Sequence, residues 1–361
     1  MRAAARLAGG AGHPRLAGDS AGGRGGKIVA SNEQSSRWFR ITAEENFLFL
    51  RRILPGIVGC YAIACLVFAV GLGELAFHPL RVPIEWRRQA ETTARRFKGT
   101  LQDVSVGSRD GITLRGWFVQ PAPYNGNAVI LLHGVGDNRQ GMGEYAELLL
   151  ANGYAVLLPD SRAQGKSGGA FATYGIKEAD DVHRWFGWLE TTDHPQCLFG
   201  LGESMGAAIL LQSLTGGPRL CAAVAESSFA SFRGVGYVRV GHLFHSGPWL
   251  GRIVLRPAVE MAFLYGRLRY GVNLADASPE RAVENVPIPI LLIHGLQDHN
   301  IPPSQSREIQ AHNSSDITLW EEVPRAEHCG AIALAPEEFS RRVLQLFGRA
   351  SPIPASAHPP T

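Results

Sequence analysis

The feature that most constrains this chain is the run Gly202-Glu203-Ser204-Met205-Gly206. An apolar run, Cys197 to Leu201, precedes it, and a helix-like stretch, Ala207 to Thr215, follows it. A G-x-S-x-G sequence between a strand and a helix is typical of a nucleophile elbow, a strained turn that exposes the serine hydroxyl. Glycine is needed on both sides because a Cβ there would collide with the neighbouring strand or helix. In a chain with 42 glycines the pattern alone also fits an ordinary strand-to-helix turn. The presence of a base and an acid to act with the serine therefore decides between the two interpretations.

A serine hydroxyl is a weak nucleophile at neutral pH, so the elbow needs a base and an acid that orients the base. In the fold that uses this elbow, the acid follows the serine and the histidine comes last. Asp298 lies in a loop after the apolar run 289–295, which we interpret as a buried parallel strand. His328 lies in the loop after a second strand-like run, 317–323. We therefore predict that Ser204, Asp298 and His328 form a catalytic triad.

Attack on an acyl carbonyl creates an oxyanion, which needs two preorganised N–H donors. We assign one donor to Met205, the residue after the nucleophile. We assign the other to Val135, in the loop that follows the apolar strand 128–132. His133 in the same loop could be mistaken for a base, but we expect it to bond loop backbone.

From about Gln102 to Arg349 the chain resembles an α/β-hydrolase of the serine esterase and lipase type, above all the membrane-anchored members of the esterase, lipase and thioesterase branch. The resemblance rests on His133-Gly134, the elbow, Asp298 with Ile301-Pro302, and His328, and on the loop 160–168. It implies an α/β fold in which a mostly parallel, doubly wound sheet carries a helical cap insertion. Glu203 is a departure, because many relatives have His there.

The alternation of elements supports this architecture. Segments 104–106 and 112–119 read as a leading hairpin, and long apolar strands then alternate with amphipathic helices up to a last helix, 336–347. Such alternation predicts a mostly parallel sheet covered on both faces. We place the hydrolase domain at 100–350 and interpret about 229–285, which is long and apolar, as a helical cap whose inner face forms an acyl-binding pocket.

The segment Ile53 to Gly73 has no formal charge and is long enough to cross a bilayer as a helix. It begins too far from Met1 to be a cleaved signal peptide. We predict a transmembrane helix at 53–76, against the alternative of a buried soluble helix. Four arginines precede the helix within 20 residues and three follow it, which favours a single-pass protein with its catalytic domain on the non-cytoplasmic side. We expect the flanking segments 1–45 and 351–361 to be disordered.

The remaining composition excludes other classes of protein. The net charge is only +3, from 35 basic and 32 acidic residues, and no basic stripe is interleaved with aromatics, so we expect no nucleic-acid partner. We also expect no cofactor and no metal. Gly165-Lys166-Ser167 resembles the end of a phosphate-binding loop, but the glycine required five residues earlier is Asp160. Cys197 and Cys221 begin neighbouring strands, which allows either a disulfide in an oxidising compartment or two buried free thiols.

These features together predict a serine hydrolase that cleaves a carboxylic ester or thioester of a small-molecule or lipid substrate through an acyl-enzyme. Two alternatives stay open. One is an amide or peptide hydrolase of the same fold, resembling a serine aminopeptidase. The other is a non-catalytic, membrane-tethered binding protein.

Overall fold

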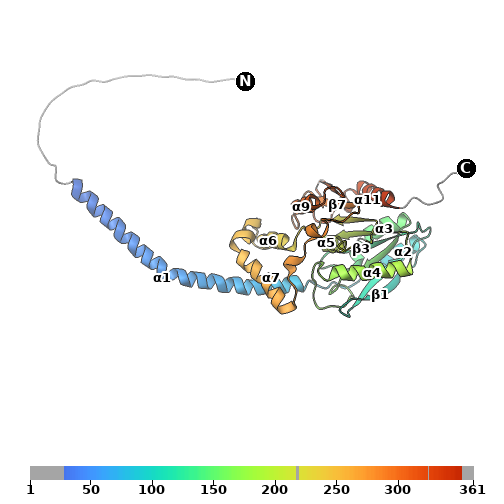
Figure 1. The fold of residues 1–361 in the computed structure, drawn as a ribbon, viewed down its shortest axis with the longest axis horizontal. Coiled ribbons are helices and arrows are strands. Elements are labelled where there is room, and N and C mark those ends of the chain that lie inside the picture. The colour runs from blue at the N-terminus through green and yellow to red at the C-terminus, as the bar shows by residue number, and fades with distance from the viewer. Residues whose placement is uncertain (1–27, 217–218, 324, 352–361) are drawn as a thin grey trace, which may run out of the picture. The chain divides into compact units, whose positions relative to one another are not determined.

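The computed structural model describes residues 28–216, 219–323 and 325–351 (Figure 1). The chain divides into two units after Ala62. The unit that begins at Ile63 contains an eight-stranded sheet in the order β1-β2-β4-β3-β5-β6-β7-β8. Its strands are β1 (Gln102–Gly107), β2 (Thr113–Val119), β3 (Asn127–Leu132), β4 (Ala155–Pro159), β5 (Cys197–Glu203), β6 (Ala222–Glu226), β7 (Ile290–Gly295) and β8 (Ile317–Val323). β2 is antiparallel to β1 and to β4, and all the other pairs are parallel. The predicted α/β-hydrolase fold, with its leading hairpin and mostly parallel sheet, is confirmed.

Helices cover both faces of the sheet, because the central parallel strands are apolar on both sides. One face packs against α2 (Arg87–Arg96), α3 (Gly143–Ala151), α10 (Ala331–Leu334) and α11 (Pro336–Ala350). The other packs against α4 (Glu178–Thr192), α5 (Met205–Gln212) and α9 (Ser304–His312). A short 3-10 helix, η1 (Arg139–Met142), leads into α3.

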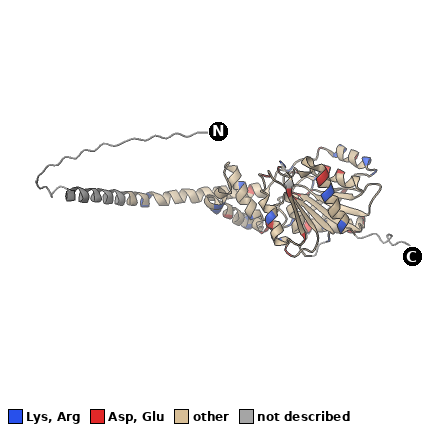
Figure 2. Cartoon of the chain, turned by 90° about the horizontal axis from the view of Figure 1, so that it is seen from above, with Lys and Arg blue, Asp and Glu red and all other residues tan. Residues whose placement is uncertain are grey.

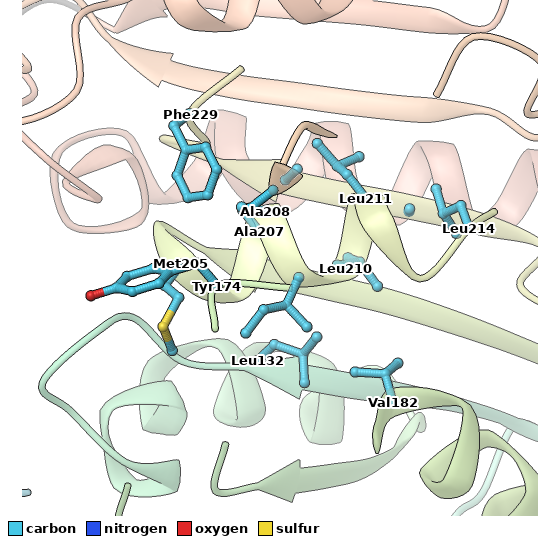
Figure 3. Close-up of a cluster of buried hydrophobic side chains, with 14 of the residues drawn as sticks. Leu132, Tyr174, Val182, Met205, Ala207, Ala208, Leu210, Leu211, Leu214 and Phe229 are labelled. Carbon is cyan, nitrogen blue, oxygen red and sulfur yellow. The ribbon is translucent and has the colours of Figure 1, made fainter. Parts of the chain in front are cut away.

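The helix that follows the predicted elbow is fixed by its surroundings. Every residue of α5 is buried. Figure 3 shows Met205, Ala207, Leu210 and Leu211 of this helix packed among side chains from other elements, including Leu132 of β3. Because close packing leaves little room for movement, the start of α5 is held rigidly against the sheet.

Between β6 and β7 the chain forms the helical insertion that we call the cap. It contains α6 (Phe232–Leu243), the π-helical turn η2 (Leu250–Val254), α7 (Arg256–Tyr270), the 3-10 turn η3 (Leu274–Asp276) and α8 (Pro279–Ala282). Arg239 Nη1 on α6 donates to Asn300 Oδ1 at 2.9 Å. This bond connects the cap to the loop that carries Asp298.

The N-terminal helix differs from expectation in its length. α1 runs from Ile28 to Phe77, and Asn46–Phe77 is long and apolar enough to cross a membrane, which agrees with the predicted span at 53–76. The prediction of disorder for 1–45 is wrong for residues 28–45, which are helical. The physical reason is that extending an existing helix avoids the cost of nucleation. The rest of that prediction, at 1–27, and most of the tail at 351–361 lie outside the described residues.

Candidate active site

Ser204 stands at a strained turn between β5 and α5. Its backbone has φ 50° and ψ −116°, in the left-handed region that costs a residue with a side chain about 1–3 kcal/mol. A Cβ on Gly202 would lie 2.6 Å from the Gly206 backbone, and one on Gly206 would lie 2.1 Å from the Leu132 carbonyl oxygen. Glycine is therefore obligatory at both positions, as the elbow interpretation requires.

The structure brings the three predicted triad residues into one hydrogen-bonded chain. His328 Nε2 lies 2.8 Å from Ser204 Oγ, and His328 Nδ1 lies 2.7 Å from Asp298 Oδ2. The Ser204 and Asp298 side chains are buried, whereas 22% of the His328 side chain is exposed. An imidazole in this position can accept a proton from the serine while its other nitrogen donates to the carboxylate.

Asp298 is held in its ionised form by a dense set of donors. The backbone N–H groups of Asn300 and Ile301 donate to Oδ1 at 3.0 and 2.9 Å. His294 Nε2 lies 3.3 Å from Oδ2 and 2.8 Å from the Ile301 carbonyl oxygen. Burial alone would raise the pKa of Asp298, but the hydrogen bonds from His294 and His328 lower it well below its ordinary value. The carboxylate therefore stays charged at any pH at which the protein is expected to work.

The loop after β3 lies directly beside the serine. A Cβ on Gly134 would come within 3.5 Å of the Ser204 Cβ. His133 is fully buried, with Nδ1 2.8 Å from the Gly134 carbonyl oxygen and Nε2 accepting from the Ser161 N–H at 3.0 Å. It bonds loop backbone, as predicted, and burial lowers its pKa, so it is neutral.

This arrangement also fixes the peptide that carries the predicted oxyanion donor. The carbonyl of Gly134 and the N–H of Val135 belong to one planar trans peptide and point in opposite directions. By holding that carbonyl, His133 fixes the direction of the Val135 N–H. The second predicted donor, Met205, is the first residue of α5, where the N–H has no partner within the helix.

A pair of acids, the half-buried Glu203 and the buried Glu226, lies beside the nucleophile. Glu203 and Glu226 are register partners at the ends of β5 and β6. The Tyr145 hydroxyl lies 2.8 Å from Glu226 Oε2 and 3.2 Å from Glu203 Oε2. One hydroxyl hydrogen cannot serve both carboxylates, so the network is complete only when one of the two acids is protonated. Burial, followed by the charge of Glu226, raises the pKa of Glu203 to about 7, and burial also raises the pKa of Glu226.

The two acids connect both loops of the site. Gly134 N–H donates to Glu203 Oε1 at 3.4 Å, on the loop that carries Val135. Ala331 N–H donates to Glu226 Oε1 at 2.9 Å, three residues after His328. The acid pair thus supports the oxyanion loop from one side and the histidine loop from the other.

Cys329, next to the histidine, is not poised as a nucleophile. Burial raises the pKa of its thiol well above the ordinary value, and nearby carboxylates add to the effect. A thiol must ionise to react, so this environment disfavours Cys329 as a nucleophile. Among the residues that the structure describes, no group of three or more His, Cys, Asp or Glu is placed to hold a metal ion.

Sequence reasoning did not identify His294, Tyr145 and Glu226 as parts of the site. Glu226 carried a usable signal, because an acid that ends an apolar strand next to β5 must lie at the same edge of the sheet as Glu203. Tyr145 lies on α3, which approaches the site from a different layer, and its sequence neighbours indicate only helix.

The alpha/beta hydrolase family matches residues 129–342, more than half of the chain, and the chain belongs to that family. The uncharacterized protein YqkD of Bacillus subtilis (strain 168) is 29% identical over 218 residues, which cover 60% of this chain and 69% of that protein. The solved Pyrococcus furiosus esterase Pf2001 is 26% identical with a TM-score of 0.60, covering 76% of this chain and 100% of that one. The uncharacterized peptidase YuxL of Bacillus subtilis (strain 168) is 25% identical over 225 residues, 58% of this chain and 32% of that protein. The fold of this chain and its relatives identify it as a hydrolase of the alpha/beta hydrolase superfamily.

Proposed function

We propose that this protein is a serine hydrolase that cleaves carboxylic ester or thioester bonds through an acyl-enzyme. The observation that carries the proposal is the unbroken hydrogen-bonded chain from Ser204 Oγ through His328 to Asp298. A buried carboxylate and a partly exposed imidazole are the groups that turn a serine hydroxyl into a nucleophile. The likeness to the esterase Pf2001 supports the same chemistry.

In the proposed reaction, His328 Nε2 takes the proton of Ser204 as Oγ attacks the acyl carbonyl. Asp298 holds the imidazole in the tautomer whose Nε2 is free to accept, and then stabilises the imidazolium. The imidazolium next protonates the leaving alcohol or thiol. The same histidine then activates a water molecule that releases the acid and restores the serine.

The backbone N–H groups of Val135 and Met205 are the proposed oxyanion donors. The support for Val135 is that Gly134 lies against Ser204 and that His133 fixes the intervening peptide. Loss of one such donor typically costs about 3 kcal/mol of transition-state stabilisation, a hundredfold or more in rate.

An amide or peptide hydrolase with the same triad is the second candidate. It is favoured by the match to YuxL, which is named a peptidase. Leaving-group preference depends on the groups that face the serine, which we propose that the cap supplies. A panel of ester, thioester and aminoacyl-amide substrates at equal concentration separates the two candidates by their relative kcat/KM.

We further propose that the protein is single-pass, with the hydrolase unit on the non-cytoplasmic side. Asn46–Phe77 supplies the candidate span. Cys197 and Cys221, whose pairing the sequence left open, form a disulfide between the starts of β5 and β6, with Cα atoms 5.8 Å apart. Disulfides persist in oxidising compartments and are rare in the cytosol, which supports this orientation.

The test uses the full chain in detergent with p-nitrophenyl acyl esters. Ser204→Ala is expected to lose turnover by a factor of about 10⁴ or more while keeping its melting temperature. Ser340→Ala, in which the removed hydroxyl bonds only within α11, is the control and should keep full activity. Wild-type turnover by Ser204→Ala would show that another group is the nucleophile.

A further inference from the structure

The end of α1 and the cap form one packed body within the unit that begins at Ile63. The Phe68 and Phe244 rings lie edge to face with their centroids 5.8 Å apart. Further along, the Phe77 ring lies against Tyr270 with the centroids 4.4 Å apart, and the Tyr270 hydroxyl donates to Glu74 at 2.6 Å. The last ten residues of the candidate span are therefore fixed against α6 and α7.

α1 is longer than a bilayer requires. Its 32-residue apolar stretch is about 48 Å long at about 1.5 Å per residue, against about 30 Å for the hydrocarbon core. About 18 Å of apolar helix are left for the interface. Phe68 to Phe77 extends about 14 Å along the axis, so the part that contacts the cap fits within this excess.

The exposed side chains of the cap have the composition of a surface that lies in a membrane interface. Large apolar side chains are exposed on it at Leu243, Phe244, Trp249, Ile253, Leu264 and Leu268. Phe244 is 52% exposed even though it contacts α1, so this apolar surface continues directly from the apolar helix. Leu264 and Leu268 are one helical turn apart and share a face of α7.

The same segment concentrates positive charge. Residues 232–270 contain six arginines and one acid, Glu260, a net charge of +5, whereas the whole chain carries only +3. Four exposed arginines, at positions 252, 256, 267 and 269, belong to this segment. Figure 2 colours the Lys and Arg residues of the chain blue. Apolar side chains with a tryptophan and surrounding arginines are the combination that binds anionic lipid surfaces.

We propose that the outer surface of the cap, from Leu243 to Leu268, docks into the headgroup region of an anionic bilayer beside α1. The apolar side chains enter the boundary between headgroups and acyl chains, and the arginines bind lipid phosphates. The cap then stands between the lipid and the hydrolase sheet. This inference does not depend on the proposed chemistry at Ser204.

The test reconstitutes the full chain into nanodiscs of phosphatidylcholine and phosphatidylglycerol, with and without bromine near the top of the acyl chains. Subtracting the fluorescence of Trp249→Phe from that of the wild type gives the contribution of Trp249. Trp86→Phe is the matched control, because Trp249 and Trp86 are 55% and 57% exposed. We expect bromine to quench the Trp249 contribution by about half, as for a group about 5–10 Å deep, and to leave Trp86 unchanged.

Two further measurements test the proposal, one with charge variants and one with an aqueous quencher. Replacing the four arginines by Gln should lower the quenching of Trp249 in anionic nanodiscs towards the value in pure phosphatidylcholine. Equal access of aqueous iodide to Trp249 and Trp86, without bromine quenching, would overturn the proposal. If Trp249 is shielded from both quenchers, and this shielding disappears when each nanodisc holds one chain, the surface binds a second copy of the chain. That result would also overturn the proposal.

Discussion

Replacing Glu203 with Gln is predicted to stabilise the protein, and to do so only where the native carboxyl would be charged. The amide keeps the shape of the side chain and still accepts from Gly134 N–H. Its NH2 group donates to the Tyr145 oxygen, as the protonated acid does, so the variant reproduces the neutral form of the network permanently.

The size of the effect follows from the pKa. Burial raises the pKa of Glu203 from 4.5 to about 7, which corresponds to about 3 kcal/mol at about 1.4 kcal/mol per pH unit. Between these two pH values the folded state binds more protons than the unfolded state. The free energy of unfolding of the wild type therefore falls as pH rises from 4.5 to about 7, and the loss is complete above that pH. The gain in Glu203→Gln should be near zero at about pH 4.5 and approach about 3 kcal/mol at about pH 8.

The assay is urea unfolding in detergent micelles between about pH 5 and pH 9, followed by tryptophan fluorescence. Glu337→Gln, which removes an exposed carboxylate, is the control and should show no such rise with pH. If the difference in free energy of unfolding between Glu203→Gln and the wild type stays constant over this pH range, the claim that the folded protein disfavours the charged form of Glu203 is refuted.

Three other changes have defined outcomes. Gly202→Ala places a methyl group 2.6 Å from the Gly206 backbone, so it should lower stability by about 3 kcal/mol or more, seen as a fall in melting temperature; an unchanged value would contradict the elbow geometry. Reduction of the Cys197–Cys221 disulfide, which joins residues 24 positions apart, should cost about 3 kcal/mol; two thiols found free by alkylation and mass spectrometry in the native protein would show that the bond does not form. His294→Ala removes a donor to Asp298, so kcat/KM should fall about tenfold and more steeply at acid pH; wild-type kinetics would mean that His294 only packs.

The sequence predicted the parts of the fold that rest on local patterns. Strands such as β3 and β7 are continuous apolar runs bounded by glycine or proline, and the elbow carries a fixed spacing of glycine and serine. The order Ser204, Asp298, His328 then placed three loops at one edge of the sheet, because parallel strands end on the same side. The structure brings the three side chains within hydrogen-bond distance.

Features that depend on tertiary contact were beyond the sequence. α2 is a polar helix whose apolar side consists only of Ala90 and Ala94, which is too short a pattern to reveal it. The acid pair beside Ser204 depends on the register of β5 against β6 and on Tyr145 reaching across from α3. The contact of α1 with the cap joins residues almost 200 positions apart, and single-sequence patterns carry no information about such pairs.

Labelling with a fluorophosphonate probe tests the central claim most directly. After tryptic digestion, mass spectrometry should find the adduct on the peptide that contains Ser204. The rate of labelling should fall by about a thousandfold or more in His328→Ala, because the imidazole no longer takes the serine proton. An adduct on another residue, or labelling of Ser204 at the same rate without His328, would contradict the account.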